Sequence, residues 1–515
     1  MTAPPTISPP APFRGRFLLD PIDRAPYATA SGILAALPQA VAVPTDRDDV
    51  AALVRWAGET RTALTPRAAG TGMPGGNVGA SVSVDLMTGF TRIGQPDPGL
   101  REVEVESGAT LAALNERCRP HRLHFPVDPS SGARCTFGGM LANNSAGPHS
   151  VRYGSTRRWV RAVEGVLADG TLVRLERGSP PGSPALRDIA ERVDSMLAPH
   201  REAIITHWPR VRKNSSGYAL REYLESGDLV DLLIGSEGTL CLMLSTEVYL
   251  APVPTQRGLA VLEFTDLERA GEAVQSLLRE QPATCEMLDR TFLELVRRAG
   301  RDEGYPLRPG LEAILLVEME GDDGREVTSA LERVADVARS LGARYTIAIG
   351  PDEQAAIWTL RRAASPIIAE QAGSRVSMQF IEDSVVPVDQ LAAYVRGLRA
   401  ILGRYEIPAV IFGHAGDANL HVNPLIDVRA PGWTRILEEV LHAVAGLVAE
   451  LGGTLAGEHG DGRLRAPFLE TIWGADMVDL FRQVKIAFDP QGILNPGVIL
   501  PLPGQRPFDH LRAYP

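Results

Sequence analysis

The chain has 515 residues, of which 44% are hydrophobic, and a formal net charge of −11. This length exceeds one ordinary hydrophobic core, so two or three domains are expected. Lys and Arg are spread along the sequence and form no basic cluster, which argues against a nucleic-acid-binding surface.

Cysteine spacing and hydropathy exclude further classes of protein. The four cysteines are far apart and form no Cys-x-x-Cys pair, which argues against an iron–sulfur cluster, covalent haem, a zinc ribbon or a disulfide framework. No apolar run approaches the roughly 20 residues that span a bilayer, and the first residues do not resemble a signal peptide. We expect a cytoplasmic protein.

The first part of the chain predicts layered helices and strands. Residues 1–37 are expected to form an N-terminal extension, and its Pro-rich first run, MTAPPTISPPAPF, is expected to be disordered or extended across the surface. The pattern then predicts a helix over 47–59, a strand over 62–65, a Gly-rich turn and a strand over 81–86. This succession indicates an α/β arrangement.

A second stretch, residues 126–252, carries another small-residue loop and a strand–turn–strand pattern over 162–175. The segment LLIGSEGTLCLMLSTEVYL predicts an apolar strand, a turn centred on 236–238 and another strand. Pro252 marks a boundary, so we interpret residues 38–253 as one two-part α/β domain.

Beyond this boundary the sequence predicts a second, α+β domain. Its elements in chain order are a strand over 259–264, a helix from Asp266, a strand over 313–318, a helix over 326–341 and a strand over 344–348. Such strand–helix pairs are typical of a ferredoxin-like sheet with extra helices. We interpret residues 254–500 as a cap domain whose last helix, over 475–487, returns to the first domain, and 501–515 as a tail.

Two small-residue regions of the first domain could bind a large anion. The loop over 66–79 contains five glycines, one arginine and no acidic residue, and its exposed N–H groups would form an anion-binding concavity. It matches neither standard nucleotide fingerprint, so a plain surface loop is equally consistent with it. The loops over 127–147, 153–156 and 235–239 add more backbone donors, as a long, negatively charged cofactor requires.

The strings GHAGDANLHVN and GEHGDG concentrate histidines and carboxylates. A turn between two apolar strands would bring His414 and His421 together, and Asn423 would share a strand face with His421. Glu458 offers a third ligand, and two histidines with one carboxylate suit Zn²⁺ and permit Mn²⁺ or Fe²⁺. His459 would stand beside the metal as a general base. The alternative is that these side chains only satisfy buried backbone groups.

Seven motifs in order, PRAAGTG, DPSSGARCTFGGMLANNSAG, YGST, IGSEGTL, GHAGDANLH, GEHGDG and FDPQGILNPG, resemble FAD-linked oxidoreductases of the vanillyl-alcohol oxidase and p-cresol methylhydroxylase type. Within that type the chain is similar to the branch of D-lactate, glycolate and D-2-hydroxyglutarate dehydrogenases. The resemblance implies a two-part FAD domain with a cap over the isoalloxazine ring.

The resemblance also implies roles for residues of the small-residue loops. It assigns the pyrophosphate to Arg67, Ala68, Ala69, Gly70, Thr71 and Gly72. It assigns the flavin ring and ribityl chain to Pro129, Ser130, Thr136, Gly138, Gly139, Asn143, Ala146, Gly147 and Gly154. It places Ile234, Glu237, Gly238 and Asn495 along the flavin. The first loop has no His or Cys for covalent attachment, so dissociable FAD is expected, although Cys135 is a thiol nearby.

For the chemistry, the resemblance implies a divalent metal on His414, His421 and Glu458, with His459 as the base. It matches Arg361 to an arginine near the active site, where it could hold the substrate carboxylate, with a surface ion pair of Arg361 or Arg362 as the alternative. Asn423 would add a hydrogen bond to the substrate. The expected reaction oxidises a 2-hydroxy acid, lactate-like and of D configuration, to the 2-oxo acid. A Lewis-acid cation eases removal of the alcohol proton, and hydride passes to flavin N5.

Departures from the family pattern bear on substrate and partners. Residues 377–381 lack a lysine that several relatives carry, which argues against a small dicarboxylate substrate. The absence of a cluster motif implies a separate electron acceptor: a quinone, an electron-transfer flavoprotein, a cytochrome or an iron–sulfur protein. Peripheral attachment to the inner membrane through that acceptor is compatible with the sequence, and a homodimer is one candidate oligomeric state.

Four alternatives stay open at this point. The first is an FAD-dependent oxidase of hydroxy acids or other alcohols that reduces O₂. The second is the flavin subunit of a larger iron–sulfur electron-transfer complex. The third is a metallohydrolase, in which the small-residue loops would have no function. The fourth is an inactive scaffold, in which His459 beside Glu458 would have no function.

Overall fold

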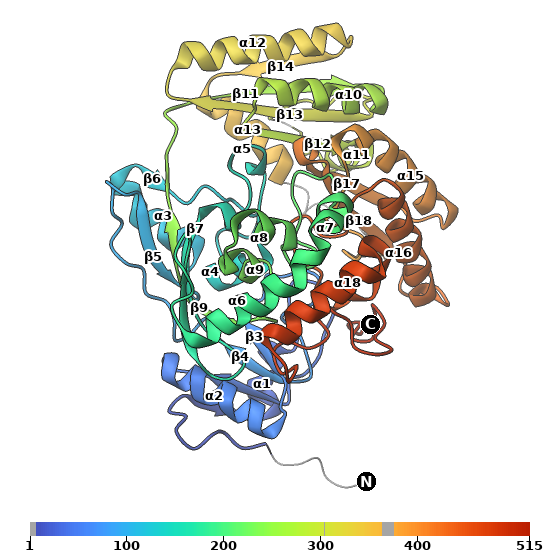
Figure 1. Ribbon diagram of the computed structural model, residues 1–515. Coiled ribbons are helices and arrows are strands. Elements are labelled where there is room, and N and C mark those ends of the chain that lie inside the picture. The colour runs from blue at the N-terminus through green and yellow to red at the C-terminus, as the bar shows by residue number, and fades with distance from the viewer. Residues whose placement is uncertain (1–6, 303, 363–374, 515) are drawn as a thin grey trace.

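The computed structural model describes residues 7–302, 304–362 and 375–514. Two units lie one above the other in Figure 1, with the first half of the chain below and a sheet-and-helix cap above. The long helix α18 (Leu469–Phe488), near the C-terminus, runs back along the lower unit.

The lower unit contains two four-stranded sheets. The first has the order β1 (Arg16–Leu18), β2 (Ala40–Val43), β4 (Val82–Asp85), β3 (Leu64–Arg67). Its β2, β4 and β3 are parallel, and β1 is antiparallel. Helix α2 (Arg47–Thr60) packs on it and begins where the Asp46 carboxylate accepts two backbone N–H groups.

The second sheet is antiparallel and has the order β5 (Glu102–Glu106), β9 (Leu242–Tyr249), β7 (Val160–Val166), β8 (Leu172–Glu176). Its core also contains helices α3 (Leu111–Cys118) and α6 (Pro184–Leu197). Trp473 and Phe481 of α18 lie in the same core. The C-terminal helix is therefore part of the lower unit.

The cap is built on an eight-stranded sheet. Its order is β14 (Arg344–Ala348), β11 (Gln256–Phe264), β13 (Ala313–Gly321), β12 (Thr284–Asp289), β17 (Ala409–His414), β18 (Asn419–Ile426), β15 (Val376–Ser377), with β16 (Ser384–Val385) also on β18. The first four strands and helices α10 (Leu267–Leu277) and α12 (Gly324–Ser340) follow the β-α-β-β-α-β order of a ferredoxin-like unit. The predicted ferredoxin-like cap is confirmed, and a further antiparallel hairpin extends it.

Different helices cover the two faces of the cap sheet. On β11, Ala260 and Leu262 pack with α10, α12, α15 (Leu391–Arg404) and α16 (Trp433–Glu450). Leu259 and Val261 pack on the opposite face with α11 (Arg290–Arg298) and α13 (Pro351–Arg362). This alternation follows from the period of two in a strand. The second face continues past α13 toward the lower unit, where it carries polar side chains.

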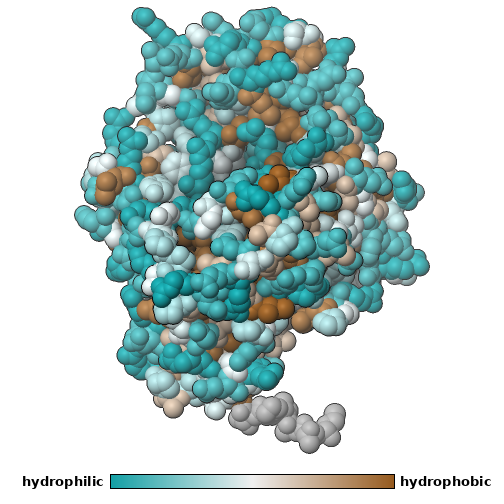
Figure 2. All heavy atoms as spheres, in the orientation of Figure 1, coloured by the Kyte–Doolittle hydropathy of each residue, from teal (hydrophilic) through white to brown (hydrophobic). Residues whose placement is uncertain are grey.

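Shorter elements complete the chain. They are α1 (Pro21–Arg24), α4 (Phe137–Asn143), α5 (Ser150–Tyr153), α7 (Arg201–His207), α8 (Leu220–Ser226), α9 (Leu229–Leu233), α17 (Gly462–Arg465), β6 (Leu123–His124) and β10 (Ala251–Pro252). Figure 2 shows a mostly hydrophilic face on which hydrophobic residues lie in small groups. Within the described ranges, no helix combines the length and apolar character that crossing a membrane requires.

Several sequence-based element predictions were wrong. The apolar segment before Gly235 is helix α9, because the Asp228 carboxylate caps its N-terminus and a short apolar run fits either element. Part of the predicted loop over 127–147 is helix α4. Strand β1, which follows the Pro-rich run, was not predicted, and residues 1–6 of that run are outside the described residues. Strand β12 was not predicted at all.

Candidate active site

One cavity of about 860 Å³ lies between the lower unit and the cap. The loop after β3, the loops around α4 and the segment before β9 line one side of it. The polar face of the cap sheet lines the other side, together with Trp358 and Arg361 of α13 and the segment that carries Glu458 and His459. Most of the polar residues singled out from the sequence therefore meet in one space.

The lower side of this cavity fits a large anionic cofactor. A Cβ atom added at Gly139 would come no closer to the protein than 3.5 Å, at Ala68 Cβ. Because Gly139 has no side chain, that space in the cavity stays open. The N–H groups of residues 69–72 donate to no backbone group that the structure describes. Free N–H groups in a glycine-rich loop form an anion site, as a pyrophosphate requires.

The residues predicted to bind FAD fall into two groups. Those that line the cavity are Arg67, Ala68, Gly70, Thr71, Gly72, Pro129, Ser130, Gly138, Gly139, Asn143, Ala146, Glu237 and Gly238. Those outside its lining are Ala69, Thr136, Gly147, Gly154, Ile234 and Asn495.

Glu237 and Asn495 act on neighbouring backbone. The buried Glu237 carboxylate accepts the N–H groups of Asp461 at 2.7 Å and Gly462 at 3.1 Å. Burial and the nearby Asp461 raise the pKa of Glu237 to about 8. The Asn495 amide donates to the carbonyls of Gly76 at 2.7 Å and Glu237 at 2.8 Å. The two side chains hold the first glycine-rich loop against the GEHGDG loop.

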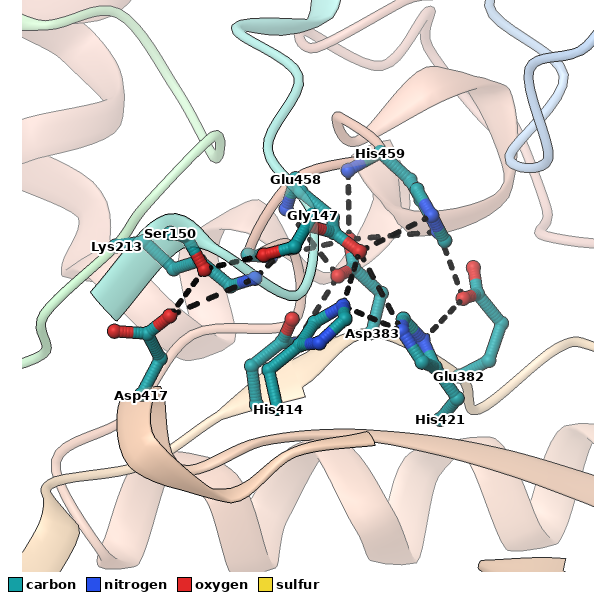
Figure 3. A network of polar contacts seen from close by, with 12 residues as sticks. Gly147, Ser150, Lys213, Glu382, Asp383, His414, Asp417, His421, Glu458 and His459 are labelled. Carbon is teal, nitrogen blue, oxygen red and sulfur yellow. Dashed lines mark hydrogen bonds and ion pairs between the residues drawn. The ribbon is translucent and has the colours of Figure 1, made fainter. Parts of the chain in front are cut away.

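The hairpin β17–β18 brings the two predicted histidine ligands together, as expected. His414 Nε2 lies 3.2 Å from His421 Nε2 and 3.1 Å from Glu458 Oε1. His421 Nε2 lies 3.4 Å from the same carboxylate oxygen. Figure 3 shows these two rings and the Glu458 carboxylate turned toward one another. The bonds of about 2.0–2.1 Å that zinc makes to nitrogen and oxygen give tetrahedral edges of about 3.3 Å, so the donor spacing fits a divalent metal.

Carboxylates behind the two imidazoles fix their orientation. Glu286 Oε1 lies 2.5 Å from His414 Nδ1, and Glu382 Oε2 lies 3.6 Å from His421 Nδ1. Each ring therefore turns its Nε2 toward Glu458. Metal-binding histidines usually have a carboxylate or carbonyl hydrogen-bonded to the ring nitrogen that does not face the metal.

His459 lies at the open side of the cluster. Its Nδ1 lies 2.7 Å from Glu382 Oε2, and its Nε2 lies 3.7 Å from Glu458 Oε1. The ring stacks on His421 with centroids 5.5 Å apart. Its side chain is 28% exposed and lines the cavity, in contrast to the 1% exposed His414. The donor atoms of Asp383, His421, Glu458 and His459 all lie within 4.8 Å of one another, a group that has His459 in place of His414.

The GEHGDG loop takes its shape from Asp383 of the cap. Its carboxylate accepts the N–H groups of Gly457 at 3.1 Å, Glu458 at 3.2 Å and His459 at 2.9 Å. Arg465 Nη1 lies 3.2 Å from the same carboxylate. Three consecutive hydrogen bonds to one carboxylate place Glu458 and His459 side by side.

Electrostatics favour ionised carboxylates in the cluster. Burial raises the pKa of Glu458, but Lys213 and His414 outweigh burial and hold it well below the ordinary value. Burial lowers the pKa of His414, but Glu286 outweighs it, and the pKa rises to about 9. Burial likewise lowers and Glu382 raises the pKa of His459, to about 9. The metal-free cluster therefore holds protons that a cation would displace.

The predicted substrate-binding residues also face the cavity. Arg361 and Asn423 line it, with the uncharged Gln379. Arg361 Nε donates to Glu286 Oε2 at 2.8 Å, and its guanidinium carbon lies 4.7 Å from the centre of the Phe412 ring. Glu286 thus holds both a predicted metal ligand and a predicted substrate-binding arginine.

Sequence reasoning missed several charged residues of the site. They are Lys213, Glu286, Glu382, Asp383 and His149. His149 links the lower unit to the cap. Glu286 lies on the unpredicted strand β12, and Lys213 lies in an irregular loop. Neither residue stands in a motif that signals its partner, since the partners are more than 100 residues away.

A glycine-rich α/β cradle under a ferredoxin-like cap, with a histidine–carboxylate cluster between them, defines a two-domain flavin-binding class. Comparison with family models agrees: residues 38–176 match the FAD binding domain, and residues 253–499 match the C-terminal domain of FAD linked oxidases. The chain belongs to this family of FAD-linked oxidoreductases.

Individual relatives fall within the predicted branch. The chain is 30% identical to the glycolate oxidase subunit GlcD of Escherichia coli, over 90% of this chain and 84% of that protein. It is 30% identical to the D-2-hydroxyglutarate dehydrogenase of Pseudomonas putida, over 95% of this chain and 50% of that protein. The chain thus spans about half the length of the dehydrogenase.

The solved structure of p-cresol methylhydroxylase with substrate bound has the same fold. It has a TM-score of 0.66 at 16% identity, and the match covers 95% of this chain and 94% of that one. The predicted resemblance to this type of protein is confirmed, as is the predicted fold class.

Proposed function

We propose that the protein is an FAD-dependent dehydrogenase that oxidises a 2-hydroxy acid, lactate-like and of D configuration, to the 2-oxo acid. The observation that carries the proposal is a cluster of His414, His421, Glu458 and His459, of which the last three line the same cavity as the glycine-rich loops. A hydrolase would need the cluster but not these loops, and a scaffold would need neither.

The residues of the cavity divide the work. Arg361 holds the substrate carboxylate, since a guanidinium suits a two-pronged contact, and Asn423 donates a hydrogen bond to the substrate. In its neutral form, which a cation nearby would favour by lowering the pKa of the ring, His459 takes the alcohol proton, and Glu382 holds its other ring nitrogen. FAD, bound without a covalent link, would supply the hydride acceptor at N5, and a divalent cation on His414, His421 and Glu458, with zinc favoured, would supply Lewis acidity.

One segment of the cavity lining, residues 377–381, bears on the substrate class. Gln379 is the residue of 377–381 that lines the cavity, and it is uncharged. Without a second cation from this segment, a monocarboxylate is favoured over a dicarboxylate such as 2-hydroxyglutarate. Electrons leave to a separate acceptor.

A flavin-bleaching screen tests the proposal. Purified protein should be yellow, and under anaerobic conditions a D-2-hydroxy monocarboxylate should bleach the flavin band faster than its L isomer or a dicarboxylate. Prior treatment with a chelator should slow the bleaching, because the alcohol proton is then harder to remove. Colourless protein that FAD does not reconstitute contradicts the assignment, and bleaching that is indifferent to chelation contradicts the metal's part in it.

A second candidate is a flavin subunit of a larger electron-transfer complex. The similarity to a protein whose name denotes one subunit of glycolate oxidase favours it. Turnover with an artificial electron acceptor by the isolated chain would support the free dehydrogenase. Stoichiometric hydrogen peroxide would instead indicate an oxidase.

A further inference from the structure

Lysine is rare in this chain and has a distinctive place in it. Of 52 Lys and Arg residues, only Lys213 and Lys485 are lysines. Lys213 lies in the loop between α7 and α8, is 7% exposed, and reaches the histidine–carboxylate cluster. An ammonium is a compact point charge, whereas a guanidinium is a wide planar fork. The site therefore receives a small cation in a chain that otherwise uses arginine.

The two oxygens of Glu458 have different neighbours. Oε2 accepts a hydrogen bond from Lys213 Nζ at 2.9 Å. Oε1 lies 3.1 Å from His414 Nε2 and 3.4 Å from His421 Nε2. Lys213 approaches this carboxylate from the side opposite the two rings in Figure 3. One oxygen is thus held by the lysine, and the other faces the donor cluster.

Other contacts keep Lys213 at Glu458. Its second acidic neighbour, Asp417, is 4.0 Å away, and the oxygens of Asp417 already accept from Arg212 Nε at 3.2 Å and Ser150 Oγ at 2.5 Å. The loop is tied to the segment before Glu458, because Ser215 donates through its N–H and its hydroxyl to two carbonyls of that segment at 2.8 and 3.0 Å. The ammonium has little freedom to move away.

We propose that Lys213 is a positioning residue that restricts Glu458 to a single metal-facing oxygen. The inference rests on the metal site of the proposed function. Two nitrogens and one oxygen suit Zn²⁺, which favours four ligands in all. A carboxylate free to bind through both oxygens suits ions that prefer more oxygen ligands, such as Mn²⁺. Lys213 therefore sets which metal the site prefers.

The test compares two metals in four proteins. Dissociation constants for Zn²⁺ and Mn²⁺ are measured on metal-free wild type, Lys213→Met, Lys485→Met and the double variant Lys213→Met/Asp417→Asn. The ratio of the Mn²⁺ constant to the Zn²⁺ constant should fall about 10-fold or more in Lys213→Met, the scale on which residues that hold a metal ligand affect metal affinity. Both ions carry the same charge, so the lost repulsion from the ammonium cancels in this ratio.

The other variants make the result decisive. Lys485→Met removes the other lysine, which bonds Asp489 at 2.6 Å, and should keep the wild-type ratio. The double variant removes one carboxylate with the ammonium, keeps the buried charge balanced, and should repeat the fall if Lys213→Met alone does not fold. An unchanged ratio in a folded Lys213 variant overturns the proposal and leaves the metal site standing. Failure of wild type to bind either ion overturns both.

Discussion

The buried charges around the histidine cluster decide which atoms face the cavity. Glu286, Glu382, Asp383 and Glu458 are all buried, and each has a fixed cationic or imidazole partner. A buried charge is costly unless it is paired and hydrogen-bonded. These partners occupy Nδ1 of each imidazole and Oε2 of Glu458. The atoms left to face one another are therefore the Nε2 nitrogens of His414 and His421 and Oε1 of Glu458.

Replacing His459 tests whether this residue acts as the general base or as a metal ligand. In His459→Asn the proton acceptor is lost, so we expect flavin reduction by the hydroxy acid to slow by about 10²- to 10⁴-fold, the usual contribution of a general base. FAD and metal content should stay at wild-type levels. Anaerobic stopped-flow measures the rate, and elemental analysis measures the metal.

The matched control is His442→Asn, an exposed histidine that contacts a carbonyl of its own helix. It should reduce flavin at the wild-type rate. A wild-type rate in His459→Asn would remove His459 from the chemistry. Loss of metal from His459→Asn would make His459 a ligand.

At the scale of elements, strand alternation gathers the polar side chains of the cap. Glu318 on β13, Glu286 on β12 and Phe412 and His414 on β17 lie on one face, and His421 on β18 is paired with Phe412. Farther along these strands the same face carries Leu316 and Leu288 against α11 and α13. Each strand thus changes from apolar to polar where the helical cover ends and the cavity begins.

The contacts of Glu286, on strand β12, predict that Glu286→Gln weakens the binding of both metal and substrate. This carboxylate has no exposed surface and holds His414 Nδ1 at 2.5 Å and Arg361 Nε at 2.8 Å. Losing the charge should weaken metal binding by about 10- to 100-fold, as outer-sphere changes do, and should raise KM for the hydroxy acid through Arg361. Glu312→Gln, which removes the partner of Arg290 and Arg399 away from the cavity, is the control. Equal metal affinity in both variants would leave Glu286 without this role.

The elements that the sequence predicted best were those with long regular patterns. Helix α2, helix α12, strand β9 and the hairpin of His414 and His421 have clear periodicity or turn signals. Helix α9 could not be told from a strand, since five apolar or acidic residues carry no period. The pairings of Glu286, Asp383 and Lys213 depend on tertiary contacts, which no local spacing encodes.

For the whole molecule, the cavity depends on how the two units are held together. Glu237 of the lower unit binds the GEHGDG loop, and His149 bridges the two units directly. His149 Nδ1 lies 2.6 Å from Asp128 Oδ2 of the lower unit, and its Nε2 lies 3.0 Å from Glu318 Oε1 of the cap. These residues also line the cavity, so the bridge closes one wall of the site.

The His149 bridge predicts a pH-dependent stability. Burial lowers the pKa of His149, but Asp128 and Glu318 raise it from 6.5 to about 10. A pKa raised by folding stabilises the fold fully below about pH 6.5, and this contribution is lost as the pH rises through about 10. Hydrogen bonds to charged groups contribute about 1.5–3 kcal/mol, and screening at Asp128, whose side chain is 41% exposed, favours the lower end.

We therefore expect His149→Gln to unfold at a lower temperature than wild type at pH 7, with the difference shrinking as the pH approaches 10. Thermal unfolding of both holoproteins at matched pH values measures it, and other groups that titrate in this range cancel in the comparison. His207→Gln, an exposed histidine that contacts a carbonyl of its own helix, should match wild type throughout. A His149→Gln deficit that is constant or grows toward pH 10 would mean that the imidazole contributes by packing and not as a cation between two carboxylates.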